Sequence, residues 1–364
     1  MVKTWPLYAK ITILILLIYL VLYGLYIGQD ILAPLGFAFL FAVLLRPMEK
    51  QFIKWRVPKI LAIVFTVVIA LLFVAGLITF LSKQIASFVQ DIPAIKHNLN
   101  SLWTQFQRWI SSTFNLTRAE QQKIIQKATS DADPVSTLGV ITASVATVIL
   151  VPVYVFLFLY YRTLLLRFVV ELFDGEHHEN VNNVIQEIRY VVQRYITGLL
   201  TETSIVAALN VTGLLIIGAP YPILLGIISA ILNLIPYIGG LVALVLTALI
   251  TFTNTGSISM AVSTIIVFMI VQLIDNNFLV PRIIASKVKI NALISVVGVL
   301  IGGALCGISG MFLSIPIIAI LKVIFDKIED LQPWGKLLGD DIPTAGVLKN
   351  VFKKRRKAGI ETKG

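Results

Sequence analysis

Residues 203–274 read TSIVAALNVTGLLIIGAPYPILLGIISAILNLIPYIGGLVALVLTALITFTNTGSISMAVSTIIVFMIVQLI and contain no aspartate, glutamate, lysine or arginine. A helix that rises 1.5 Å per residue needs about 20 apolar residues to cross a hydrocarbon core of roughly 30 Å. The stretch can therefore hold three crossings if it turns at the APYP and NTGS segments, 219–222 and 254–257. The predicted spans are about 203–219, 223–252 and 258–274.

Five further uncharged or nearly uncharged runs flank this stretch. They are 11–29, 31–45, 60–82 and 138–161 before it, and 290–321 after it. Charged residues such as Arg46 and Arg162 close the runs and can reach the lipid headgroups. The first two runs meet at Asp30 and are expected to form a hairpin. The sequence thus predicts an all-α, polytopic membrane protein with about eight transmembrane helices.

The composition supports this class of protein. Hydrophobic residues make up 57% of the chain and charged residues 13%, whereas soluble domains average roughly 45–50% and 25%. The net charge of +11 does not indicate nucleic-acid binding, because the basic residues lie at the ends of apolar runs and form no stripe with aromatic residues. The single cysteine, Cys306, excludes an internal disulfide framework and a multi-cysteine metal site.

Sequence motifs for enzymatic chemistry are missing. The chain has no phosphate-binding glycine-rich loop, no HExxH and no nucleophile elbow. We therefore expect no enzyme, no cofactor, no metal and no nucleotide-driven transport by this chain alone. His177 and His178 are adjacent, so they do not share a helix face, and a solvated turn is the preferred interpretation over a metal site.

The distribution of Lys and Arg predicts that both termini are cytoplasmic. With eight spans, one face holds the N-terminus, the 46–59 loop, the 162–202 segment and the tail from Lys322, with 21 Lys and Arg residues together. The other face holds 9, in 83–137 and 275–289. Basic residues favour the cytoplasmic side.

Charged stretches divide the chain into four parts. These are membrane helices 1–3 (1–82), a polar helical insertion (83–137), membrane helices 4–8 (138–327) and a basic tail (328–364). Within the third part, an amphipathic segment at 177–200 is expected to continue into the fifth span. In the tail, the KKRRK cluster at 353–357 is interpreted as a membrane-surface anchor.

The insertion carries a heptad-like apolar seam over 85–109, which would be buried against a partner helix. Its alternatives are a helix that lies on the membrane or one that folds back on its own chain. The seam consists of Ile85, Phe88, Ile92, Ile95, Leu99, Leu102, Phe106 and Trp109.

The most informative membrane segment is NLIPYIGG at 233–240. Proline removes a backbone donor and clashes with the preceding turn, so the span should be bent or broken near Pro236. Irregular backbone at membrane depth survives where it is buried in protein or lines a wet cavity, and transporters commonly bind solute at such breaks. The alternative is a proline kink that only shapes packing. The candidate path or hinge residues are Asn233, Pro236, Tyr237, Gly239 and Gly240.

A second candidate segment, QLIDNNFLVPR at 272–282, contains a carboxylate at the end of the long uncharged stretch. A carboxylate near bilayer depth is costly, so its presence suggests a function. The alternative is a hydrated interfacial cap with a local counter-charge. The candidate residues are Gln272, Asp275, Asn276, Pro281 and Arg282, and Glu202 poses the same question.

The last span is rich in glycine and is predicted to form a packing surface. Small residues at four-residue spacing let helix backbones approach closely, and packing is preferred over a solute path. The packing residues are Gly298, Gly302, Gly303, Gly307 and Gly310, with Cys306 in the same series.

Up to about Lys327 the chain resembles the autoinducer-2 exporter family, or PerM-like permeases. The resemblance rests on IPYIGG at 235–240, on Asp275-Asn276 followed by PRII at 281–284, and on the closing glycine and proline pattern from 302 to 316. Ala285 stands where a glycine is usual in the family, and Asn291-Ala292 where His-Pro is frequent.

The resemblance implies a multi-pass protein of the bacterial inner membrane that exports a small hydrophilic signalling molecule. Some relatives resemble sodium or lithium/proton antiporters, for which Asp275 and Glu202 are the available carboxylates. A non-transporting membrane scaffold is the hypothesis from a different class. Partners are then a small polar solute, a monovalent cation or proton, and membrane lipid. We also expect a homo-oligomer through 85–109 and the last span.

Overall fold

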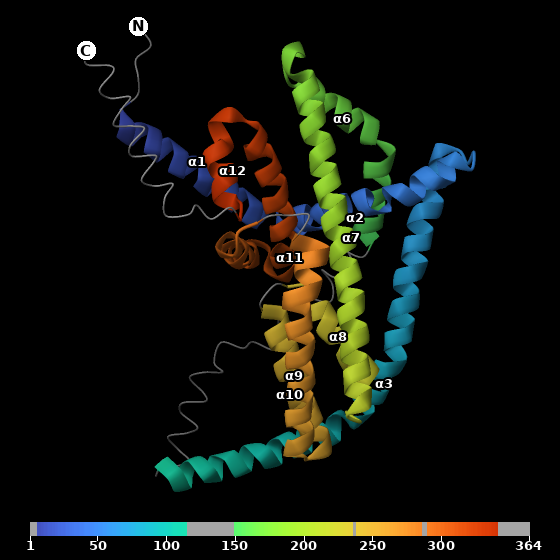
Figure 1. The fold of residues 1–364 in the computed structure, drawn as a ribbon, viewed down its shortest axis with the longest axis vertical. Helices are drawn as coiled ribbons and strands as arrows, with labels where there is room; N and C mark the ends of the chain where they lie inside the picture. Colours follow the sequence, from blue (N-terminus) through green and yellow to red (C-terminus); the bar gives the residue numbers. More distant parts are fainter. Residues whose placement is uncertain (1–5, 115–148, 236–237, 286–289, 341–364) are drawn as a thin grey trace.

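The computed structural model describes residues 6–114, 149–235, 238–285 and 290–340, and every element in these ranges is a helix (Figure 1). This confirms the all-α prediction. Six of the described helices are long and apolar enough to cross a membrane. The number is seven if the bent pair Ile149–Tyr160 and Arg162–Glu171 is taken as one further span. The count of eight is not confirmed, and two predicted crossings are in fact helical hairpins.

The N-terminal helices α1 (Leu7–Ile27) and α2 (Gln29–Lys54) follow one another without a loop. Backbone hydrogen bonds from Gly28 to Gly24 and from Leu32 to Gly28 carry the helical pattern across the junction. The predicted hairpin at Asp30 is therefore wrong, because no turn interrupts the helical bonds, and Figure 1 shows the two helices in succession. α1 leaves its apolar side chains exposed, whereas α2 packs on α7 and α11.

Helix α3 (Lys59–Phe114) continues without interruption across residue 83, where the boundary between membrane helix and insertion was predicted. Its far end bends past the lower ends of α8 and α9 (Figure 1). There Phe88 packs edge-on against Tyr221, and Asn98 Nδ2 donates to the Thr253 carbonyl at 2.6 Å. This part of the 85–109 segment therefore folds back on its own chain, and the remainder of the insertion, 115–137, lies outside the described residues.

The middle of the chain contains the helix Ile149–Tyr160, which bends by 64° into α6 (Arg162–Glu171). A short turn, η1 (Gly175–His177), then leads to α7 (His178–Ile216). The 177–200 segment and the fifth span thus form one helix, as expected. α7 packs against α2, α6, α8, α10, η2 and α11, and it is the central element of the fold.

The predicted sixth span is a hairpin of two helices, α8 (Pro222–Leu232) and α9 (Ile238–Thr255). Asn254 Nδ2 lies 3.2 Å from Tyr221 Oη at the open end, and Ser229 Oγ lies 3.2 Å from Thr247 Oγ1 further in. These pairs show that the two helices run antiparallel. The break expected near Pro236 is present, but the chain returns there instead of crossing, so the predicted 223–252 crossing is wrong.

Helix α10 (Ile258–Ile274) follows and continues into the π-helix η2 (Asp275–Ala285). The two together run antiparallel to α7. Gly213 on α7 lies against Val267, and Gly198 lies against the Ile283 carbonyl. This pairing brings the middle of α7 next to the junction of α10 and η2.

Helix α11 (Ala292–Lys327) is the second hairpin, because Cys306 and Gly307 have non-helical backbone angles. The backbones of Gly302 and Gly310 meet between its two legs, and Gly298 lies against Ile318. The predicted single crossing at 290–321 is therefore wrong. The glycines that were expected to support an oligomer serve contact within one chain, so the homo-oligomer stays a prediction.

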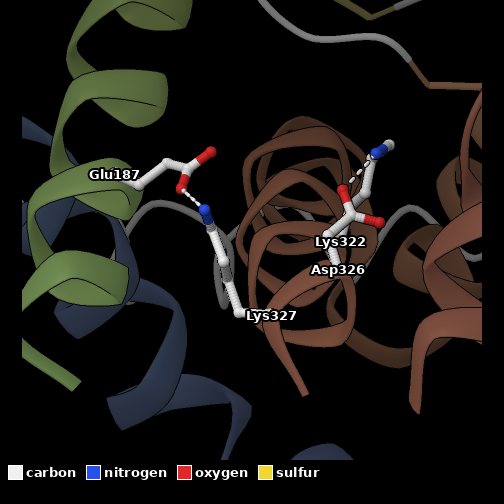
Figure 2. Close-up of polar contacts among 4 residues, drawn as sticks. All are labelled: Glu187, Lys322, Asp326 and Lys327. Carbon is white, nitrogen blue, oxygen red and sulfur yellow. Dashed lines mark hydrogen bonds and ion pairs between the residues drawn. The ribbon is translucent and has the colours of Figure 1, made fainter. Parts of the chain in front are cut away.

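The second hairpin is closed by η3 (Glu329–Leu331) and α12 (Gln332–Leu338). The Asn291 N–H donates to the Leu338 carbonyl at 3.0 Å. Figure 2 shows two polar contacts at this end: Lys327 pairs with Glu187 of α7 at 2.9 Å, and Lys322 pairs with Asp326 one helical turn away. The first pair ties α11 to α7.

We predict that Gly302→Ala destabilises the protein strongly. A Cβ atom at Gly302 would lie 2.3 Å from the Gly310 carbonyl oxygen, so the legs would have to separate. Overpacking of this kind costs typically about 1–3 kcal/mol. Thermal unfolding in mild detergent measures the effect. Gly76→Ala in α3 is the matched control, because a Cβ atom there meets nothing within 4 Å. Equal melting temperatures for the two variants would contradict the hairpin packing.

Candidate functional site

The two hairpins meet at a cavity of about 700 Å³ beside α7 and α10. The tip of the first hairpin and α9 line one part of it, and residues near both legs of the second hairpin line another. The polar lining residues are Tyr195, Glu202, Asn233, Gln272, Asp275, Asn276, Ser295 and Asp340. The apolar lining includes Leu199, Leu244, Phe268, Met269 and Ile315.

Two buried carboxyl groups form the centre of the site. Glu202 on α7 is 3% exposed, and Asp275, the first residue of η2, is 2% exposed. Asn233 follows the last residue of α8 and bridges them. Its Nδ2 donates to Glu202 Oε1 at 3.2 Å and to Asp275 Oδ2 at 3.1 Å. The middle of α7, the end of α8 and the start of η2 are thus linked through one side-chain amide.

Asp275 retains hydrogen-bonding capacity. Its second oxygen, Oδ1, is buried and accepts no hydrogen bond within the described part of the chain. A buried acceptor without a partner is costly, by about 1–3 kcal/mol for a neutral group and more for a charged one. The carboxyl group is therefore suited to accept a hydrogen bond from, or to coordinate, a group that enters the cavity.

Local backbone irregularity explains why these polar groups converge. The first hairpin reverses between Leu232 and Ile238, which places Asn233 at its tip. On the other side, Pro281 lies within η2 and offers no backbone donor. The wider π-helix begins at Asp275, and such segments are frequent at functional sites.

The neighbouring amides extend the polar surface. Gln272 Nε2 donates to Asn276 Oδ1 at 3.2 Å. A Cβ atom at Gly240 would lie 2.8 Å from Gln272 Oε1 and 3.1 Å from Asn233 Oδ1. Glycine at position 240 therefore lets both amide oxygens approach the backbone of α9.

The structure separates the residues that the sequence singled out. Glu202, Asn233, Gly240, Gln272, Asp275 and Asn276 line the cavity. Gly239 instead lies at the turn, where a Cβ atom would be 1.7 Å from the Leu232 carbonyl oxygen. Pro281 and Arg282 belong to η2 but do not line the cavity, and Pro236 and Tyr237 lie outside the described residues.

Several lining residues were missed by the sequence analysis. Tyr195, Phe268, Met269 and Ser295 lie within apolar or amphipathic helices, where nothing in the local sequence distinguishes them from packing residues. Among these four, Ser295 is the small polar residue, and its place within the apolar run 290–321 is a weak indication of function.

A helical protein with several apolar membrane-length helices and paired carboxyl groups at a cavity between them has the architecture of a membrane transporter. Comparison with known families agrees. Residues 13–330 match the family described as AI-2E family transporter. The chain therefore belongs to the AI-2E transporter family, which is a family of transporters.

Two of the known relatives are similar to this chain over most of their length. The chain is 23% identical to "AI-2 transport protein TqsA" of Escherichia coli over 338 residues, which cover 91% of this chain and 96% of that protein. It is 27% identical to "Putative transport protein YueF" of Bacillus subtilis, over 80% of this chain and 82% of that protein. A shorter match to "Putative transport protein YrrI" of the same organism has 35% identity over 129 residues, which cover 35% of this chain and 36% of that protein.

We predict that Asn233→Ala destabilises the protein, because two buried carboxyl groups lose their shared donor. The loss should be about 1–3 kcal/mol or more. Adding Glu202→Gln should recover part of it, because the new amide can donate to Asp275. A double-mutant cycle on thermal stability measures this coupling. Strictly additive effects of the two substitutions would contradict the bridged arrangement.

Proposed function

We propose that this protein is a secondary transporter or facilitated exporter that carries a small hydrophilic solute through the cavity between the two hairpins. The observation that carries the proposal is the cavity itself, which places carboxyl and amide groups inside a bundle of apolar helices. Ligand pockets typically measure about 300–1,000 Å³, and the volume of about 700 Å³ lies in this range.

The chemistry of the lining suits a neutral solute with several hydroxyl groups. Carboxyl and amide oxygens accept hydrogen bonds from hydroxyl groups, and the amide nitrogens of Asn233 and Gln272 donate them. An autoinducer-2-like signalling molecule has this character, and TqsA is named as an AI-2 transport protein. The family match favours transport over a non-transporting scaffold.

A specific observation also supports a second function, sodium or lithium/proton antiport. Glu202 and Asp275 are both buried, and their oxygens lie within 3.2 Å of one amide nitrogen. Two such carboxylates repel each other unless a proton or a cation balances their charge. Exchange of a proton for a monovalent cation at this pair is the elementary step that antiport requires.

The family and the apolar helices fit a multi-pass protein of the bacterial inner membrane. Our proposal places both termini in the cytoplasm. The concentration of Lys and Arg residues in the N-terminus, the 46–59 loop, the 162–202 segment and the tail supports it.

We predict that Asp275→Asn and Glu202→Gln separate the two functions. In vesicles that contain a pH-sensitive dye, antiport gives a sodium- or lithium-driven proton signal that both variants lose. Export of a neutral solute gives no such signal with any alkali cation, and the variants alter solute flux instead. Glu171→Gln is the matched control, because Glu171 is exposed on α6 and does not line the cavity. If both site variants match this control in proton signal and in solute flux, the cavity is not the transport site.

We predict different consequences for two adjacent glycines. Gly240→Leu should lower solute flux per folded molecule, because the side chain enters the space between Gln272 and Asn233. Gly239→Leu should lower the amount of folded protein, because its Cβ atom collides with the backbone at Leu232. Flux in reconstituted vesicles, divided by folded protein from size-exclusion chromatography, distinguishes them. Normal flux per folded molecule in Gly240→Leu would contradict a path beside α9.

A further inference from the structure

Away from the cavity, positively charged side chains from three helices gather in one region. Arg46 on α2, Arg162 at the start of α6 and Arg189 on α7 come from helices that are in contact, since α2 and α6 each pack against α7. The three side chains lie within electrostatic range of one another, and Lys50 on α2 adds a fourth charge. Glu49 is the carboxylate whose charge acts on Arg46 and Arg162 in this region. The region therefore carries an excess of positive charge, and we call it the arginine cluster.

The three guanidinium groups are unpaired within the described part of the chain. None of them forms an ion pair or a hydrogen bond there, although each guanidinium carries five N–H donors. Arg46 is only 8% exposed, and its Nη1 is buried without an acceptor. Burial of an uncompensated charge is strongly unfavourable, so an anionic partner would remove a substantial penalty.

Nearby acidic residues do not fill this role. Glu49 is 6% exposed but does not come within ion-pair distance of the arginines. Glu187, two residues before Arg189 on α7, is paired with Lys327 at 2.9 Å (Figure 2). The partner that suits the cluster therefore comes from outside the described chain.

The position of the cluster in the sequence indicates its depth. Arg46 ends the apolar run 31–45, and Arg162 ends the run 138–161. Basic residues at the ends of membrane-spanning segments lie at the level of the lipid headgroups. Next to the cluster, α6 turns by 64° from the preceding helix and buries none of its residues. Its Leu164 and Phe168 are exposed, as expected for contact with acyl chains.

We propose that the arginine cluster binds a phosphate group, supplied by the headgroup of an anionic phospholipid. The planar fork of arginine matches phosphate oxygens bidentately, and three such groups from three helices can surround one phosphate. The apolar surface of α6 beside the cluster then accommodates the lipid tails. Bound lipid would hold α2, α6 and α7 together at one end of the bundle.

The test uses the full-length protein, delipidated in mild detergent. Short-chain phosphatidylglycerol and phosphatidylcholine with identical acyl chains are compared by native mass spectrometry and thermal unfolding, with inorganic phosphate as a third probe. The site variants are Arg162→Gln and Arg189→Gln, which are only half-buried, and Arg46→Gln. The matched controls are Arg167→Gln on α6 and Arg194→Gln on α7. Arg167 pairs with Glu171, and Arg194 stacks on Tyr190.

We expect wild type and both controls to bind phosphatidylglycerol at least tenfold more tightly than phosphatidylcholine, and the site variants to lose this preference. If inorganic phosphate protects the wild type as well as phosphatidylglycerol does, and the site variants lose this protection, free phosphate replaces lipid as the source. The proposal is overturned if wild type shows no preference for either phosphate probe. It is also overturned if Arg162→Gln and Arg189→Gln, folded normally, bind like their controls.

Discussion

The burial of Glu202 and Asp275 among apolar helices is the constraint on which the rest of the site depends. Carboxyl groups that leave water need donors, and these must come from the protein itself where the surrounding surface is apolar. Here a single amide, that of Asn233, donates to both groups. The tip of the first hairpin must therefore reach the middle of α7 and the start of η2.

The hairpins satisfy this requirement with little irregular backbone. In each one, two helical legs keep their own hydrogen bonds, and the non-helical residues that the structure describes between the legs are 233–235 in the first hairpin and Cys306 and Gly307 in the second. Close backbone contact between the legs replaces some of the side-chain packing, as at Gly302 and Gly310. At the open end of the first hairpin, Tyr221 adopts a left-handed conformation (φ 48°) and contacts Phe88 and Asp91 of α3. This contact stabilises the open end of the first hairpin.

The sequence was sufficient for the helical class and for the break near Pro236, and it singled out six of the residues that line the cavity. It was not sufficient for the path of the chain. Hydropathy reports whether a segment is apolar and long enough to cross, and the runs 223–252 and 290–321 pass that test although each reverses halfway. The glycine spacing from 298 to 310 indicated close contact between backbones, but the spacing is the same whether the partner is another helix or the second leg of one helix. Tyr195 and Ser295 reach the cavity only because separate helices meet there, which local patterns do not encode.

Helix α7 connects the features that carry the two proposals. Its outer part bears Glu187 and Arg189, and its middle bears Glu202, with a rise between Arg189 and Glu202 of about 20 Å at 1.5 Å per residue. The first hairpin packs on it where Gly226 meets Val211, and the second packs on it and on α2 through a core that includes Val192, Leu199, Val299 and Leu313. Neither hairpin can shift relative to the other without changing its contact with this helix. Since the cavity lies where both hairpins meet α7, a displacement of either one would alter the surroundings of Glu202, and with them the balance of charge at the carboxyl pair.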